Sequence, residues 1–132
     1  MDELNKHISE IEQEILRLSD KYKTALNLIR TVPGFDKNPL TAIQVLSEIG
    51  GDMSVFPTAK HLVSWAGCCP RNDQSNQKIK STRISRAGSY FKPILVQVAN
   101  ALIKSKKHPE FTDRYRRIKA RRGHKKAVIA AV

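Results

Sequence analysis

The chain has 132 residues, enough for one ordinary domain or for one domain with an appendage. Twenty-four Lys and Arg against twelve Asp and Glu give a formal charge of +12, which favours a polyanionic partner. The longest apolar run, Ala127 to Val132, is far shorter than the roughly 20 residues that cross a bilayer, so no membrane partner is expected. Two adjacent cysteines and four scattered His do not make a metal site, and no cofactor is expected in this chain. The missing secretory signal and the unpaired thiols favour a reduced cytosolic setting.

The positive charge lies entirely in the second half of the chain. Residues 61–132 hold seventeen basic and three acidic residues, whereas residues 1–60 hold seven basic and nine acidic ones. Like charges at this density repel each other unless a counter-ion is near. A solvated charged surface is the plain interpretation, and a nucleic-acid-binding surface is the one that we favour.

Residues 2–30 are predicted to form one long helix. Its apolar side chains recur at alternating spacings of four and three, the a/d pattern of a left-handed coiled coil: Leu4, Ile8, Ile11, Ile15, Leu18, Tyr22, Ala25 and Ile29. We favour a coiled coil that joins two chains into a homo-oligomer, or two domains, over an amphipathic helix that packs on its own domain.

A tight turn at residues 31–35 (TVPGF) is predicted to end this helix. Asn38 is expected to cap a second helix, which has Pro39 at its first position and ends at Gly50. A helix, a Pro-Gly turn and a helix resemble a helix-hairpin-helix unit, whose backbone N–H groups hold a phosphate. Asp36 stands where such hairpins have a second glycine, so this turn either contacts DNA or only packs.

Four further helices are predicted, which makes the fold class all-α. They cover residues 58–65, residues 89–105, the stretch from Pro109 to before Gly123, and the chain from His124 onward. Trp65 is expected in the core rather than on a base-stacking surface. The last helical pattern is unfinished at Val132, so we expect the chain to be a piece of a longer protein.

The least regular segment runs from residue 68 to residue 88 and is rich in hydroxyls, amides and bases. A loop of this length inside a domain is usually functional or disordered, and residues 77–84 could form a short strand or ribbon. A serine hydroxyl becomes a nucleophile when its proton is removed, and nearby cations neutralise the charge that grows on an attacked phosphate. On this logic the candidates are Ser75, Ser81, Thr82 and Ser85, and hydroxyls that only serve turns are the alternative.

Several short motifs, in order and spacing, resemble one family. They are the TVPGF turn, residues 42–50, residues 56–70 with their Ala-Gly-x-x-Pro, Ser75, and the Ile-Ser-Arg-Ala-Gly of residues 84–88. Together they resemble the C-terminal domain of the IS-110/IS-116/IS-902 type of insertion-sequence transposases, relatives of the pilin-gene DNA invertases. The resemblance covers residues 31–132 and the preceding helix.

The resemblance implies a recombinase in two parts. An N-terminal RuvC-like domain, absent from this chain, would bind Mg²⁺ through four acidic residues. The C-terminal domain would supply a serine that attacks DNA and forms a covalent protein–DNA intermediate. Some members select their DNA through an element-encoded bridge RNA, so a guide RNA is an implied partner besides DNA. The setting implied is bacterial, cytoplasmic and nucleoid-associated.

Carried over by position, the catalytic nucleophile is Ser75. Two family glycines are Asn76 and Gln77 here, and the usual lysine is Arg86. Charge and proximity suggest the nucleic-acid-binding residues Lys78, Lys80, Arg83, Arg86, Lys92, Arg116, Arg117, Arg121 and Arg122.

The expected organisation is a coiled-coil helix over residues 1–30 and a transposase C-terminal domain over residues 31–132, inactive without the RuvC-like part. Two alternatives stay open. One is a non-catalytic, dimeric helix-hairpin-helix module that binds nucleic acid. The other is a coiled-coil adaptor whose basic half binds acidic protein.

Overall fold

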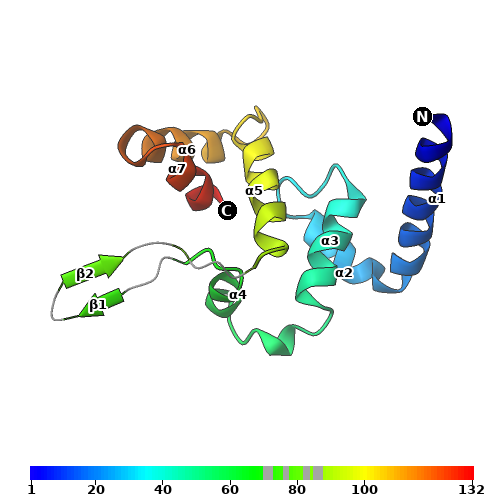
Figure 1. Ribbon diagram of the computed structural model, residues 1–132, viewed down its shortest axis with the longest axis horizontal. Helices are drawn as coiled ribbons and strands as arrows, with labels where there is room; N and C mark the ends of the chain where they lie inside the picture. Colours follow the sequence, from blue (N-terminus) through cyan, green and yellow to red (C-terminus); the bar gives the residue numbers. More distant parts are fainter. Residues whose placement is uncertain (70–72, 76–77, 82–83, 85–87) are drawn as a thin grey trace. The chain divides into compact units, whose positions relative to one another are not determined.

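The computed structural model of the chain describes residues 1–69, 73–75, 78–81, 84 and 88–132 (Figure 1). The chain divides into two compact units, Met1–Gly51 and Asp52–Val132. Helices make up most of both, which confirms the all-α class. Within the described ranges, one two-stranded hairpin adds to the helices.

The first unit contains, in chain order, α1 (Asp2–Ser19), the 3-10 turn η1 (Asp20–Tyr22), α2 (Lys23–Arg30) and α3 (Pro39–Ile49). One continuous helix over residues 2–30 was therefore the wrong prediction, because η1 interrupts it. The Ser19 hydroxyl donates a hydrogen bond to the Leu16 carbonyl at 2.8 Å, an alternative to the helical ladder. Tyr22, at φ −104° and ψ 18°, leaves the helical conformation. The break lets α2 pack on α3.

The apolar stripe of α1 stays exposed within the described residues, although α1 contacts α3. No residue of α1 is buried, and Leu4, Ile11 and Leu18 keep 61%, 60% and 58% of their surface exposed. Ala25 and Ile29, which continue the stripe on α2, are half-buried. The predicted apolar stripe is therefore exposed on α1, before η1, and half-buried on α2, after it.

Helix α3 starts and stops as the sequence predicts. The Asn38 side-chain oxygen accepts a hydrogen bond from the Leu40 amide at 2.9 Å, and Pro39 occupies the first turn. Gly50 ends the helix at φ 75°, a conformation that glycine adopts without strain. Two helices joined by a Pro-Gly turn are thus present. The phosphate-binding role of a helix-hairpin-helix motif stays a prediction.

The second unit contains the remaining elements: η2 (Met53–Val55), α4 (Ala59–Trp65), β1 (Asp73–Ser75), β2 (Lys78–Ser81), α5 (Phe91–Leu102), α6 (Pro109–Arg122) and α7 (His124–Ala131). All four predicted helices are confirmed. Helix α5 is shorter at both ends than the predicted 89–105, and Pro93 lies in its first turn, where a missing N–H costs nothing.

The core of the second unit lies between α5, α6 and α7. Ala99 on α5 contacts Val128 and Ala131 on α7, and all three side chains are buried. Ile103 and Tyr115 pack against them from α5 and α6. Small alanine side chains let the helices approach closely, and this packing leaves the opposite face of α6 to the solvent.

Strands β1 and β2 form an antiparallel hairpin. Its Cα partners are Asp73 with Ser81, Gln74 with Ile79, and Ser75 with Lys78. An irregularity in register lies between Asp73 and Gln74. The short strand or ribbon expected within residues 77–84 is thus confirmed as β2, and its partner strand β1 lies before that range.

Candidate nucleic-acid interface

Ser75, the predicted nucleophile, is the last residue of β1. Its backbone lies opposite that of Lys78, the first residue of β2, and Lys80 lies two residues further along the same strand. The surroundings of these three side chains lie outside what the structure describes, as do Arg83 and Arg86 entirely. The roles given to these residues stay predictions.

The two chain segments that lead into and out of the hairpin meet at Ala66 and Gly88. Gly88 has φ +66°, and a Cβ atom there would lie 2.4 Å from the Ala66 carbonyl oxygen and 2.9 Å from its carbonyl carbon. Ala66 is buried, with 1% of its surface exposed. We call this contact the hairpin root, because it fixes where the chain leaves the helical core and returns to it.

Three aromatic rings lie beside the hairpin root. The Trp65 ring centroid lies 5.4 Å from that of Phe56, edge to face, and 5.8 Å from that of Phe91, tilted. Phe91 is buried, whereas Trp65 keeps 42% of its surface exposed. Placing Trp65 in the core was therefore only half right, since one part of its ring packs on core residues and the rest meets solvent.

Helix α6 separates an apolar face from a cationic one. Phe111, Tyr115 and Ile118 are half-buried, as the pattern predicts. Arg114, Arg117 and Arg121 recur at spacings of three and four and are exposed, so they form one stripe along the outer face. We call these three residues the α6 arginine stripe.

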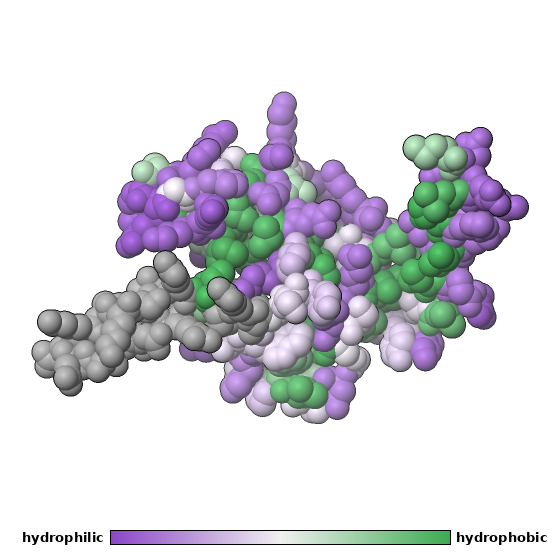
Figure 2. Space-filling view, viewed as in Figure 1, coloured by the Kyte–Doolittle hydropathy of each residue, from purple (hydrophilic) through white to green (hydrophobic). Residues whose placement is uncertain are grey.

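The structure brings together four of the predicted nucleic-acid contacts on this helix. Arg116, Arg117, Arg121 and Arg122 all lie on α6 and are exposed. Arg114 was missed, although its spacing to Arg117 in the sequence was a sufficient signal. Within the described part of the chain, none of these five guanidinium groups pairs with a carboxylate. Figure 2 shows hydrophilic side chains gathered over α6 and α7.

A hydrogen bond joins α6 to α7. The Tyr115 hydroxyl lies 2.7 Å from His124 Nδ1, and the two rings meet edge to face at 5.9 Å. Lys119 Nζ lies 5.5 Å from the centre of the Tyr115 ring, within cation–π range. Lys125 and Lys126, exposed in the first turn of α7, therefore extend the cationic surface of α6 at a fixed position.

Lys92, the remaining predicted contact, lies apart from the α6 arginine stripe. It is in the first turn of α5 and is half-buried. Burial raises the pKa of the Cys68 thiol, and the nearby Lys92 charge opposes this shift without cancelling it. Lys92 thus lies near the hairpin root rather than on α6.

The basic side chains of α1, unlike the arginines of α6, form ion pairs with carboxylates of the same helix. Arg17 donates to Glu14 at 2.6 Å, and Lys6 lies 4.0 Å from Glu10. The Arg17 hydrogen bond lowers the pKa of Glu14, and the same bond raises the pKa of Arg17. Lys6 and Arg17, the Lys and Arg residues of α1, therefore each have a carboxylate partner on the same helix.

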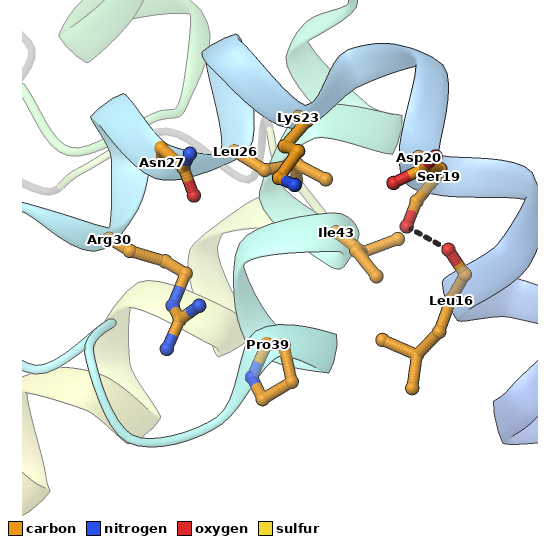
Figure 3. A pocket seen from close by; sticks show the side chains of 9 residues that line it. All are labelled: Leu16, Ser19, Asp20, Lys23, Leu26, Asn27, Arg30, Pro39 and Ile43. Carbon is orange, nitrogen blue, oxygen red and sulfur yellow. Dashed lines mark hydrogen bonds between the residues drawn. The ribbon is translucent and has the colours of Figure 1, made fainter.

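A hollow of about 220 Å³ opens in the first unit where α1 gives way to η1. Figure 3 shows its lining side chains, which come from α1, η1, α2 and α3. Asp20, Lys23 and Arg30 give the hollow both signs of charge among aliphatic neighbours. The Arg30 guanidinium donates to the Asp36 carbonyl at 3.1 Å and so holds the Pro-Gly turn.

Neither a cluster of metal ligands nor a membrane-spanning helix is found among the described residues. No group of three or more His, Cys, Asp or Glu side chains lies close enough together there to hold a metal ion. No helix in the described part of the chain combines the length and apolarity needed to cross a membrane.

Comparisons with known proteins identify relatives. A family model described as "Transposase IS116/IS110/IS902 family" matches residues 26–116. The chain is 28% identical over 129 residues to the pilin gene-inverting protein of Moraxella lacunata, and equally to that of Moraxella bovis. Each match covers 95% of this chain but 39% of the relative's length. No solved structure matches.

Proposed function

The chain belongs to the IS116/IS110/IS902 transposase family, and from this premise we propose that it is the DNA-binding, serine-bearing part of a transposase or site-specific recombinase. The observation that carries the proposal is the exposed, uncompensated α6 arginine stripe in the same unit as the Ser75 hairpin. Arginines at this density favour a phosphate backbone as their counter-ion. The relatives from Moraxella, which are named for inverting a pilin gene, support the same reaction class.

The proposed chemistry is an exchange of phosphodiester bonds. The Ser75 oxygen attacks a backbone phosphorus and forms a serine–phosphate bond, while the bond from phosphorus to a deoxyribose oxygen breaks. The serine proton goes to a base, and the released deoxyribose oxygen takes up a proton. A second deoxyribose hydroxyl then attacks the same phosphorus and joins the new strands, while the bond from phosphorus to the serine oxygen breaks. The proton lost by the attacking hydroxyl is balanced by the proton that the Ser75 oxygen takes up. Nearby guanidinium groups would offset the charge that grows on the phosphate oxygens.

Magnesium has no place in this part of the proposal. The described residues lack a set of metal ligands, so we assign no step of this chain to the ion. The family resemblance gives Mg²⁺ to a RuvC-like domain. We propose that such a domain lies in the remaining length of the whole protein, because the chain spans 39% of the length of its curated relatives.

Two partners besides DNA belong to the proposal. The exposed stripe of α1 would pair with the same stripe of a second chain, because its apolar side chains follow the a/d pattern and ion pairs flank it. A guide RNA would use the same phosphate contacts as DNA, since both backbones carry the same charge.

The test uses the whole protein and a nicked suicide DNA substrate, on which a covalent intermediate accumulates. We expect Ser75→Ala to abolish the covalent protein–DNA adduct while leaving DNA affinity unchanged. Ser81→Ala, in the facing strand of the hairpin, is the matched control and should still form the adduct. An adduct with Ser75→Ala would refute the role of Ser75, and binding without an adduct in the wild type would point to the non-catalytic module.

A further inference from the structure

We propose that Trp65 and Tyr90 form a stacking site for unpaired nucleic-acid bases beside the hairpin root. The proposal rests on the proposed function and deepens it, because it names the form of nucleic acid that the Ser75 hairpin meets. Its ligand is an unpaired nucleobase, from a single-stranded DNA end or from a guide RNA.

Both residues expose a large part of their surface to solvent. Trp65 keeps 42% of its surface exposed and Tyr90 keeps 75%. Tyr90 is the residue that precedes α5, and the next side chain, Phe91, is buried with 4% exposure. The chain thus presents one aromatic side chain to the core and its neighbour to the solvent.

The core holds the Trp65 ring in place. Phe56 contacts it edge to face at 5.4 Å, and Phe91 contacts it at 5.8 Å. A ring supported in this way loses little freedom when a ligand stacks on its open part, which favours binding.

Backbone packing ties the two aromatic residues to one place. Ala66, the neighbour of Trp65, contacts Gly88 so closely that a Cβ atom at Gly88 would collide with its carbonyl oxygen. Gly88 accepts a backbone hydrogen bond from the Lys92 amide at 2.8 Å, which fixes the turn that carries Tyr90. Trp65 therefore lies one residue, and Tyr90 two residues, along the chain from the hairpin root.

The charge of the second unit selects the class of ligand. Residues 52–132 hold eighteen basic residues and four acidic ones, so an anionic polymer is favoured over an apolar protein segment. Stacking on aromatic rings beside cations is how proteins bind unpaired bases, and a paired base inside a duplex has no free face to offer.

The chain reports on this site by its own fluorescence, because Trp65 is its single tryptophan. We expect an oligo(dT) or oligo(U) strand to quench Trp65 emission, whereas an abasic strand of equal length and charge binds without quenching. Comparison of oligo(dT) with oligo(U) distinguishes a DNA end from a guide RNA as the source of the base.

Substitutions test the contribution of stacking to affinity. Tyr90→Leu should weaken binding of oligo(dT), followed by anisotropy of a labelled strand, about tenfold, and should leave the abasic strand unaffected. Tyr90→Phe should bind as the wild type does. Tyr22→Leu, which changes a tyrosine of the first unit with 44% exposure, is the matched control and should change nothing.

The outcomes separate this site from the function on which it rests. Equal affinity for oligo(dT) and the abasic strand, without quenching, would overturn the stacking site and leave nucleic-acid binding intact. No binding of either strand, nor of duplex DNA, would overturn both.

Discussion

Gly88 crosses the backbone of Ala66 so closely that no side chain fits between them, since a Cβ atom on Gly88 would lie 2.4 Å from the Ala66 carbonyl oxygen. The φ of +66° at Gly88 adds a second requirement for glycine. Trp65 precedes Ala66, and Tyr90 follows Gly88 by two residues, so this contact brings the backbones of the two exposed aromatic residues close together. The hairpin root is therefore the point where packing and the proposed site depend on each other.

Gly88→Ala tests that dependence. Gly123→Ala is the matched control, because Gly123 also has a positive φ, +82°, but has nothing within 4 Å of a Cβ position. We expect Gly123→Ala to lower the free energy of unfolding by about 1–3 kcal/mol through backbone strain. Gly88→Ala should cost about 1–3 kcal/mol more through the collision. Urea unfolding followed by Trp65 fluorescence measures both, and equal losses would contradict the close crossing.

Tyr115→Phe should loosen the junction of α6 and α7. The change removes a hydroxyl that lies 2.7 Å from His124 Nδ1 and leaves the ring packing in place. We expect a loss of about 0.5–1.5 kcal/mol in the free energy of unfolding, the usual net worth of one hydrogen bond. Tyr90→Phe, which changes a tyrosine with 75% exposure, should have no effect. The same stability for the wild type and Tyr115→Phe would show that this bond contributes nothing.

Cys68 should be a slow nucleophile in the folded chain. Burial raises the pKa of its thiol, so at pH 8 a smaller fraction is thiolate, the reactive form, than in the unfolded chain. Alkylation by iodoacetamide, followed by peptide mapping, should therefore be slower for folded Cys68 than in urea. Lys92→Met should slow it further, because the Lys92 charge lowers this pKa. Faster alkylation in the folded chain would contradict the assignment.

Local signals in the sequence predicted the helices well. Asn38 with Pro39 marked the start of α3, and Gly123 separated α6 from α7, because caps and glycines act on the backbone next to them. The break at η1 could not be predicted in this way. An unbroken heptad fits a straight helix, and only the packing of α2 on α3 favours the bend.

In the candidate site, too, local sequence signals predicted some features, whereas others depend on contacts between residues distant in sequence. Charge and helical spacing predicted the cations of α6, and Arg114, which was not among the predicted contacts, follows the same spacing to Arg117. The exposure of Trp65 could not be foreseen, since a tryptophan in an apolar helix face is most often buried. Its surroundings depend on Phe91, which is distant in sequence and approaches through the contact between Ala66 and Gly88.

The most direct test of the account is the salt dependence of DNA binding by the α6 arginine stripe. Each phosphate contact contributes about 0.9 to the slope of log K against log salt concentration on duplex DNA. Substitution of Arg114, Arg117 and Arg121 by alanine, which retains helix propensity, should lower that slope by about 2 to 3. The matched control replaces Lys6, Arg17 and Lys21 in the first unit, two of them ion-paired, and should leave the slope unchanged. An unchanged slope for the α6 variant, or an equal loss in the control, would contradict a nucleic-acid interface on α6.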